Sequence, residues 1–222
     1  MVQRKSMAIQ MRIAGVVLCK DPQYPIFKYT LESLKYFDDI VVITEKDDVI
    51  SRLRYKASYL SDCEYQFHLD EDEVIHPDVY FELKRIWERH SRAIIVCPRV
   101  HIKKGKLVYS AKWRINDPQA RGIPRFTVWK FPIHHVPLGK QYIQIKYPIV
   151  HYGNCIETWN IDNLCKTHMR WKSLNAESLF DRYKVSNCKE LIKKLNNDKE
   201  ISIYSLYDQS VLPNLEVIKC LK

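Results

Sequence analysis

The 222-residue sequence contains no apolar run long enough to cross a lipid bilayer. Its seven cysteines include no pair with CxxC spacing, which argues against a thiolate zinc site. An odd number of cysteines without a dense framework favours free, buried thiols in a reducing compartment. The amino-terminal stretch starts with basic residues, but Arg12 interrupts its apolar part, so a first strand explains it better than a signal peptide. We therefore expect a cytoplasmic protein whose only contact with a membrane is peripheral.

Positive charge exceeds negative charge, with 36 Lys and Arg against 26 Asp and Glu. This excess favours polyanionic partners, namely nucleic acid, an anionic membrane or phosphorylated substrates, although a basic surface without a specific partner is an equal alternative. Fourteen Tyr and five Trp can also line a groove for a flat or sugar-like ligand.

Apolar runs and helical periodicities alternate over the first hundred residues. Apolar runs predict strands over 13–19, 40–44 and 93–100, and the alternation of Tyr65, Phe67 and Leu69 predicts a strand over 65–69. The helices between them are predicted from apolar stripes at Ile26, Phe27, Leu31, Leu34 and Phe37, at Ile50, Leu53, Ala57 and Leu60, and at Val79, Leu83, Ile86 and Trp87. This order predicts an α/β fold with a mostly parallel, Rossmann-like sheet in a three-layer sandwich.

The second half of the chain is patterned differently and predicts a smaller mixed α/β region. A hairpin turn is expected at Lys103–Lys106, and strands over 125–131 and 142–152, the latter broken by Pro148. Helices are expected over roughly 160–172 and over 189–195.

The stretch HLDEDEVIHPD, residues 68–78, has four carboxylates in succession. One interpretation is a solvated loop whose charges complement the start of the next helix. However, the run directly follows a strand, and ligands bind at the carboxyl ends of strands in parallel sheets. Asp70 and Asp72 then project to the same side, where each like-charged pair near 4 Å costs about 1 kcal/mol in water and more at a protein surface. A divalent cation removes this repulsion, and oxygen ligands suit Mn²⁺ or Mg²⁺.

The segment LDEDEVIHPD resembles the LDADE-type DxD motif of GT-A glycosyltransferases, specifically the family 2-like enzymes. The likeness covers roughly residues 10–100, and PRVHI, RFTVWKF and PIVHYG look more loosely like later family elements. It implies a nucleotide-sugar-binding half over 1–105 and an acceptor-side region of the same domain, with carboxyl-terminal helices, over 106–222. It also implies an inverting transfer of a sugar from a UDP- or GDP-sugar to a hydroxyl of a glycan, protein or lipid-linked acceptor.

The resemblance implies roles for single residues. Asp72 would bind the metal that bridges the two phosphates, Asp70 would touch the ribose or share the ion, and His151 would be a further metal ligand. Lys20 and Glu45, at the ends of the first two strands, would lie near the nucleotide. For His151 the alternative is a strand-end histidine bonded to backbone.

Three arginines could neutralise phosphates bidentately, or could be solvated surface charges: Arg114, Arg121 and Arg125. No family-type base motif follows the acidic run. Asp117, in the loop before RFTVWKF, is the best candidate for the catalytic base, with a turn residue before Pro118 as the alternative.

Three other functions fit parts of the sequence. The net charge of +10 suits a nucleic-acid-binding protein, but no basic-aromatic motif or zinc module supports one. Paired carboxylates also suit a metal-dependent nuclease or nucleotidyltransferase, which would need further acids and a lysine in the site. The third alternative is a degenerate protein that binds a sugar nucleotide without catalysis.

Overall fold

The computed structural model describes residues 11–45, 47, 49–103, 106–108, 117–130, 136–154, 184–196, 200–201 and 206–213. The main sheet consists of β1 (Ile13–Leu18), β2 (Asp39–Ile43), β3 (Tyr65–Asp70), β4 (Glu73–Val74), β5 (Ile94–Lys103), β6 (Lys106–Val108), β7 (Asp117–Pro124), β10 (Tyr142–Gln144), β11 (Ile149–Asn154) and β12 (Glu200–Ile201). A separate pair is formed by β8 (Trp129–Lys130) and β9 (Val136–Pro137). The helices are α1 (Phe27–Ser33), α2 (Ile50–Leu60), α3 (Val79–Arg89), α6 (Cys188–Asn196) and the short 3₁₀ helix η2 (Gln209–Val211).

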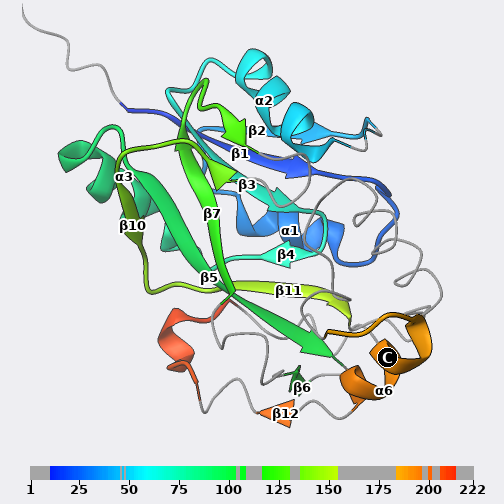
Figure 1. Cartoon of the computed structure of the whole chain (residues 1–222). Coiled ribbons are helices and arrows are strands. Elements are labelled where there is room, and N and C mark those ends of the chain that lie inside the picture. Colours follow the sequence, from blue (N-terminus) through cyan, green and yellow to red (C-terminus); the bar gives the residue numbers. More distant parts are fainter. Residues whose placement is uncertain are drawn as a thin grey trace, which may run out of the picture.

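The ten-stranded sheet follows the order β12-β6-β5-β7-β3-β1-β2, with β10 and β11 beside β5 and β4 beside β11 (Figure 1). Strands β2, β1 and β3 are parallel, and β7 runs antiparallel between β3 and β5. Strand β5 therefore points the same way as β3, and β10 and β11 are parallel to β5. The predicted α/β fold with a mostly parallel, Rossmann-like sheet is confirmed.

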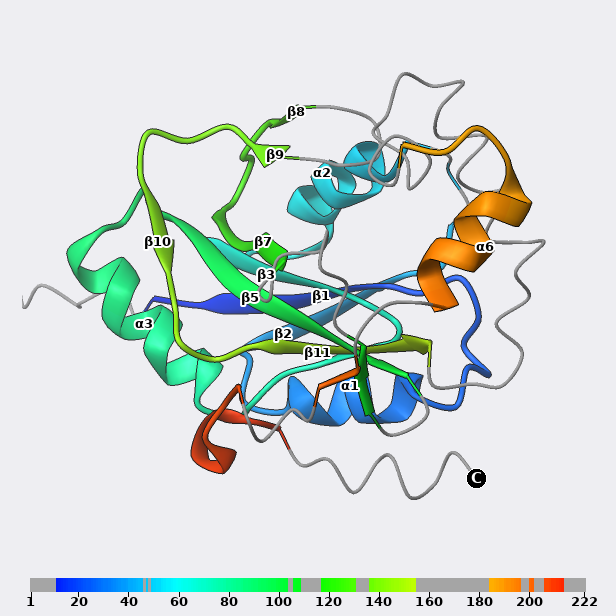
Figure 2. The same ribbon diagram turned by 60° about the horizontal axis from the view of Figure 1, so that its bottom comes forward.

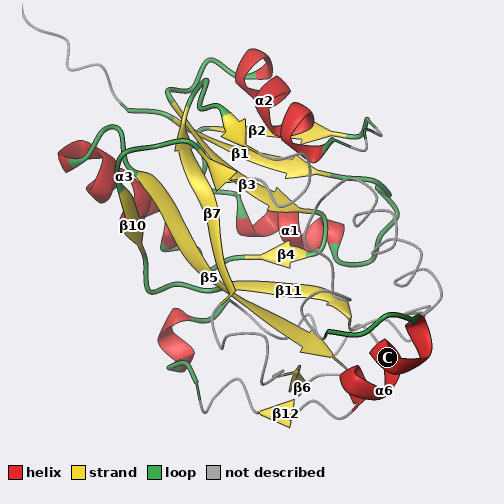
Figure 3. Ribbon diagram, viewed as in Figure 1, coloured by secondary structure: helices red, strands yellow, loops and turns green. Residues whose placement is uncertain are grey.

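Helices cover both faces of this sheet (Figures 2 and 3). On one face α2 packs Leu53 and Ala57 against β1 and β2. On the other face α1 and α3 enclose the largest core cluster, in which Trp87 is 1% exposed and stacks on Tyr65 at 4.3 Å between ring centroids. Among the described residues, no helix is long and apolar enough to span a membrane.

The predicted stripe of α3 is confirmed, because all four of its residues are buried. The predicted stripe of α2 is wrong at Leu60, which is half exposed. The buried face of this helix instead includes Arg54, which is fully buried. A charged side chain on the inner face of a helix needs buried partners, and the site described below supplies them.

The sequence prediction of a strand over 125–131 is wrong. The strand is β7, which starts eight residues earlier, and among the described residues 125–130 only Trp129 and Lys130 belong to a strand of their own, in the separate pair. Phe126 has a φ of 62°, a left-handed conformation that turns the chain after β7. The segment that forms β7 contains Pro118, Gly122 and Pro124 and therefore shows no strand pattern in the sequence. It is extended because it pairs with β3 on one side and with β5 on the other.

The other expectations for the second half fare better. Strands β10 and β11 flank Pro148 as expected, β5 and β6 form the hairpin, and α6 contains 189–195. The helix expected over 160–172 lies outside the described residues. Cys19, Cys63 and Cys97 are free and buried as expected, whereas Cys188 is disulfide-bonded, which corrects the expectation for that residue.

Gly122 allows β7 to approach β5 closely. A Cβ atom there would lie 2.8 Å from Cβ of Ile95 and 3.3 Å from Cδ2 of Leu83. We expect Gly122→Ala to lower the free energy of unfolding by about 1–3 kcal/mol, as overpacked cores do, measured by urea denaturation. Gly15→Ala is the matched control, because its new Cβ meets only the flexible side chain of Leu34 at 3.0 Å. A loss at Gly122 no larger than the loss at Gly15 would contradict this account.

Candidate functional site

Residues 70–73, here called the acidic turn, connect β3 to β4 at the carboxyl edge of the parallel strands. The backbone of this turn is held from two sides: Thr30 Oγ1 donates to the Glu71 carbonyl at 2.9 Å, and the Tyr152 N–H donates to the Asp72 carbonyl at 2.8 Å. Strand β4 then pairs with β11. The four carboxylates therefore have three different surroundings: Asp70 and Glu73 share one, and Glu71 and Asp72 each have their own.

The carboxylates of Asp70 and Glu73 meet three arginines, Arg54, Arg99 and Arg121, here called the arginine network. Arg54 Nη2 donates to Asp70 Oδ1 at 2.8 Å. Arg121 Nη2 bridges Asp70 Oδ2 at 3.1 Å and Glu73 Oε1 at 2.7 Å, and Arg99 Nη1 lies 3.3 Å from Glu73 Oε1. Arg54 and Glu73 are fully buried, and Arg121 is 2% exposed. Both oxygens of Asp70 therefore accept guanidinium protons.

The network holds three guanidinium cations against two carboxylates. Burial by itself would raise the pKa of Asp70, but Arg121 and Arg54 outweigh burial and hold this pKa well below its usual value. Burial and the neighbouring charge of Arg121 lower the pKa of Arg54 to about 9, which leaves Arg54 charged at neutral pH. Nε and Nη1 of Arg121 are buried without a hydrogen-bond partner in the described part of the chain. The network thus has an excess of positive charge and of donors.

Glu71 points away from the network and binds the end of β1. Its Oε2 accepts the backbone N–H groups of Lys20 and Asp21, the latter at 2.8 Å. Burial, followed by the charge of Glu71, raises the pKa of Cys19 to about 11. The Cys19 thiol is therefore protonated at neutral pH and is no nucleophile. Glu71 fixes the loop after β1 against the acidic turn.

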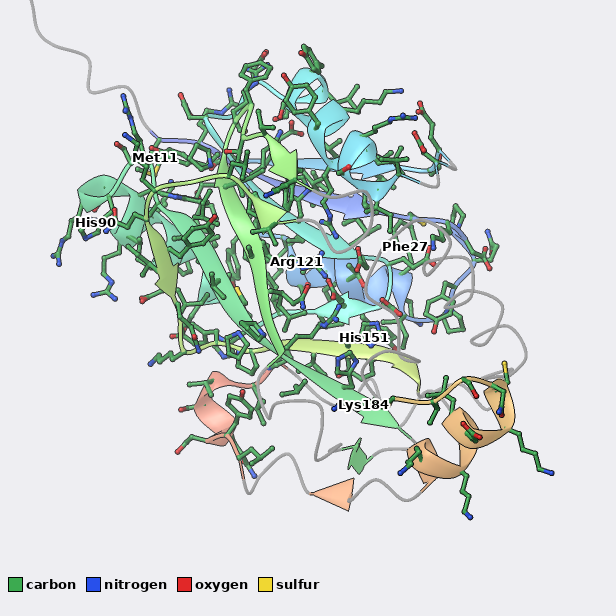
Figure 4. All side chains as sticks on the ribbon, in the orientation of Figure 1. Met11, Phe27, His90, Arg121, His151 and Lys184 are labelled. Atoms are coloured by element: carbon green, nitrogen blue, oxygen red, sulfur yellow. The ribbon has the colours of Figure 1, made fainter. Side chains whose placement is uncertain are left out.

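Asp72 faces a pair of histidines from the neighbouring strands. Its Oδ2 lies 3.3 Å from His151 Nε2, and His151 Nδ1 lies 3.1 Å from His101 Nδ1 (Arg121 and His151 are labelled in Figure 4). The side chains of Asp72 and His151 are 18% and 19% exposed, so a ligand can reach both. Burial, reinforced by the nearby carboxylates, raises the pKa of Asp72 although His151 opposes the shift. A cation placed here would offset the burial and the repulsion that disfavour the ionised form of Asp72.

The structure divides the predicted metal ligands. Asp72 and His151 come together and offer a carboxylate oxygen and an imidazole nitrogen, which are donors that Mn²⁺ accepts. Asp70 has other partners, because each of its oxygens accepts a guanidinium N–H of the arginine network, and its role as a metal ligand stays a prediction. Within the described ranges there is no group of three or more His, Cys, Asp or Glu side chains placed for a metal ion. A cation held by Asp72 and His151 would take its remaining ligands from water and substrate oxygens, as Mg²⁺ and Mn²⁺ commonly do.

The other predicted site residues are dispersed. The Lys20 backbone lies at the acidic turn, whereas Glu45 forms an ion pair with Lys56 of α2. Asp117 begins β7 opposite Arg99, at the same edge as the acidic turn. Arg125 does not lie with them. Its backbone N–H donates to the Glu64 carbonyl before β3, at the opposite edge of the sheet. Arg114 lies outside the described residues.

Several residues of the site were missed from the sequence: Arg54, Glu71, Glu73, Arg99 and His101. Arg54 left a usable signal, since it directly follows Leu53 and precedes Ala57 by three positions on the buried face of α2. Arg99 and His101 are two positions apart along β5, so both lie on the same face of the strand.

An aromatic cavity lies beside the network, on the outer side of α2. Its volume is about 420 Å³, and Tyr55, Tyr59 and Trp129 line it together with Arg52 and Lys56. The Trp129 ring lies 5.7 Å from the Arg54 guanidinium, which in turn binds Asp70. These aromatic side chains therefore lie on the outer side of α2, joined to Asp70 through the buried Arg54, and their use in binding a flat or sugar-like ligand stays a prediction.

No protein-family model matches this chain, and no curated protein matches it. Solved structures of TarS from S. aureus align with it. The first of these TarS chains is 9% identical to this chain, with a TM-score of 0.42. Their alignment covers 83% of this chain and 42% of that TarS chain. A chain of TarS 1–349 shares 9% identity with a TM-score of 0.40, covering 84% and 71%, and its complex with UDP-GlcNAc shares 11% with a TM-score of 0.36, covering 83% and 70%. The present chain thus spans less than half of the first TarS chain, and its function has to be argued from its own residues.

Proposed function

We propose that this chain is a glycosyltransferase that moves a sugar from a UDP- or GDP-sugar to an acceptor hydroxyl at the acidic turn. The observation that carries the proposal is the pairing of Asp72 with His151 at 3.3 Å, at the carboxyl edge of parallel strands. Ligands of α/β sheets bind at this edge. The turn also has the sequence LDEDE, which resembles the DxD motif.

Asp72 and His151 would hold Mn²⁺ or Mg²⁺, and such an ion would offset the charge that develops on the leaving diphosphate. The arginine network has an excess of cations on the inner side of the turn and keeps Asp70 ionised and fixed. Glu71 holds the loop at Lys20 against the turn, which shapes the nucleotide side of the site. These residues bind and orient the donor before chemistry.

Asp117 is the proposed base, since it begins β7 at this edge. Its carboxylate takes the proton of the acceptor hydroxyl while the acceptor oxygen forms a bond to the anomeric carbon. The bond from that carbon to the diphosphate breaks, and its electron pair leaves with the diphosphate. Attack opposite the leaving group inverts the anomeric configuration.

The arginine network argues against the nuclease or nucleotidyltransferase alternative. Two-ion sites of that kind need several carboxylates free to ligate metal. Here Asp70 and Glu73 are both engaged by guanidinium groups, with Arg121 shared between them. Of the four carboxylates of the acidic turn, that of Asp72 is the one that lies beside His151, the proposed metal ligand.

Ligand-dependent thermal stabilisation tests the proposal. With Mn²⁺ present, a UDP- or GDP-sugar is expected to raise the Tm, since a ligand at 100 times its Kd adds about 2.7 kcal/mol. Asp72→Ala should abolish this rise. Asp62→Ala, which removes a carboxylate whose side chain is 92% exposed, is the control and should keep it. If single-stranded oligonucleotides stabilise the protein and no sugar nucleotide does, the nucleic-acid alternative is correct instead.

A further inference from the structure

We infer that, when a cation binds, His101 is a positioning residue that stabilises the tautomer of His151 with its proton on Nδ1, so that the lone pair of Nε2 faces the cation beside Asp72. This inference rests on the proposed function, because it concerns the cation site of that function. His101 acts through His151: the ring of His101 contacts His151, and His151 faces the Asp72 carboxylate.

The sheet itself builds this contact. Strands β5 and β11 are parallel, and His101 and His151 are direct partners in their register, one position after the pair Val100 and Val150. Val100 and Val150 are buried, at 4% and 0% exposure, and pack in one apolar cluster. Because this core fixes the two strands, the imidazole rings meet at 4.7 Å between centroids with an interplanar angle of 66°. The pair is therefore a fixed feature of the sheet and not a chance contact of surface side chains.

The hydrogen bond between the rings couples their tautomers. Two Nδ1 atoms at 3.1 Å can bond only when one carries the proton and the other offers a lone pair. If His101 donates, neutral His151 carries its proton on Nε2 and directs it at Asp72. If His151 donates, its Nε2 is bare and faces the Asp72 oxygen at 3.3 Å. Only the second arrangement offers two lone pairs to one cation.

His101 can accept as well as donate, so it permits the second arrangement and stabilises it once a cation binds. Metal-bound histidines commonly donate their other N–H to a partner that fixes the ring and the tautomer. In this chain that partner is an imidazole from the adjacent strand. Loss of such partners typically costs 10–100-fold in metal affinity.

Mn²⁺ binding in the absence of donor sugar tests this role directly. We expect His101→Phe, which keeps an aromatic ring but removes the acceptor, to weaken Mn²⁺ binding by about 10–100-fold in a titration followed by electron paramagnetic resonance. His101→Gln retains an acceptor oxygen and is expected to bind Mn²⁺ more tightly than His101→Phe. His151→Ala should lose the site. Circular dichroism of each variant checks that it is folded.

A second readout uses the unmodified protein. Nitrogen-15 spectra of the imidazoles with Mg²⁺ bound should show His151 protonated on Nδ1 and bare on Nε2. A proton on Nε2 of His151 under these conditions overturns the inference even if the variants fail to fold. Unchanged Mn²⁺ affinity in His101→Phe, with loss in His151→Ala, overturns the role of His101 alone. Absence of Mn²⁺ binding to the unmodified protein overturns the cation site as well, while stabilisation by a sugar nucleotide still reports separately on donor binding.

Discussion

Replacing Arg121 with methionine is expected to destabilise the folded protein by about 3–5 kcal/mol. Arg121 is the only network member that contacts both carboxylates, at 3.1 Å from Asp70 and 2.7 Å from Glu73, among the residues that the structure describes. Its removal leaves Glu73, which is fully buried, with a weaker contact to Arg99 at 3.3 Å. A loss of this size is a large part of the 5–15 kcal/mol that stabilises a typical domain. Urea unfolding at pH 7 measures it.

Arg85→Met is the matched control. Arg85 also pairs with a carboxylate at 2.7 Å, that of Glu82, but its side chain is 58% exposed. Surface pairs of this kind contribute about 0–1 kcal/mol, so the control should change stability little. Equal losses of unfolding free energy in the two variants would mean that burial of the network contributes nothing to stability.

The loss caused by Arg121→Met should also depend on pH. The folded-state pKa of Asp70 lies below its unfolded value, so its ionised form stabilises the protein above an unfolded pKa of about 3.9. That contribution disappears as the pH falls through the folded-state pKa. Because the variant lacks the cation that depresses this pKa, the difference in stability between the two proteins should narrow below about pH 4. A difference that stays constant down to pH 2 would exclude the Asp70–Arg121 pair as its source.

Strands β1 and β2 could be predicted because they are continuous apolar runs, which a buried sheet accommodates. The position of the acidic turn followed from the alternation of β3, since Asp70 comes directly after Tyr65, Phe67 and Leu69 and ends this strand. Strand β7 could not be found this way. It pairs with β3 and β5 on its two sides, and its Gly122 is explained by the close approach of Ile95 and not by strand propensity.

The arginine network was hidden for a related reason. Arg54, Arg99 and Arg121 are separated from their carboxylates by 16, 26 and 48 residues, so no local spacing reveals the pairing. The sequence predicts Asp72 as a metal ligand and Asp70 as a ribose contact or a shared metal ligand. Folding gives the two carboxylates different partners: Asp70 accepts from buried guanidinium groups, and Asp72 lies beside His151.

This division predicts the variant with the largest effect on activity. Asp72→Asn is expected to lower the rate of sugar transfer at saturating donor by about 100-fold or more, because it removes the charge that binds the cation at the leaving diphosphate. The amide keeps the size of the side chain and can still bond His151, so the turn should stay folded. Initial rates of release of UDP or GDP with Mn²⁺ measure the effect, with urea unfolding as the check on stability.

Asp78→Asn provides the comparison, since Asp78 lies in the same segment, near His76 at 3.8 Å, with its side chain 55% exposed. It removes the same charge from the same stretch of sequence without touching the edge of the sheet. If both variants lose activity equally, the acidic stretch acts only through its total charge. If Asp72→Asn alone loses activity while its stability is unchanged, the four carboxylates have separate tasks, and the one that faces His151 is the one on which transfer depends.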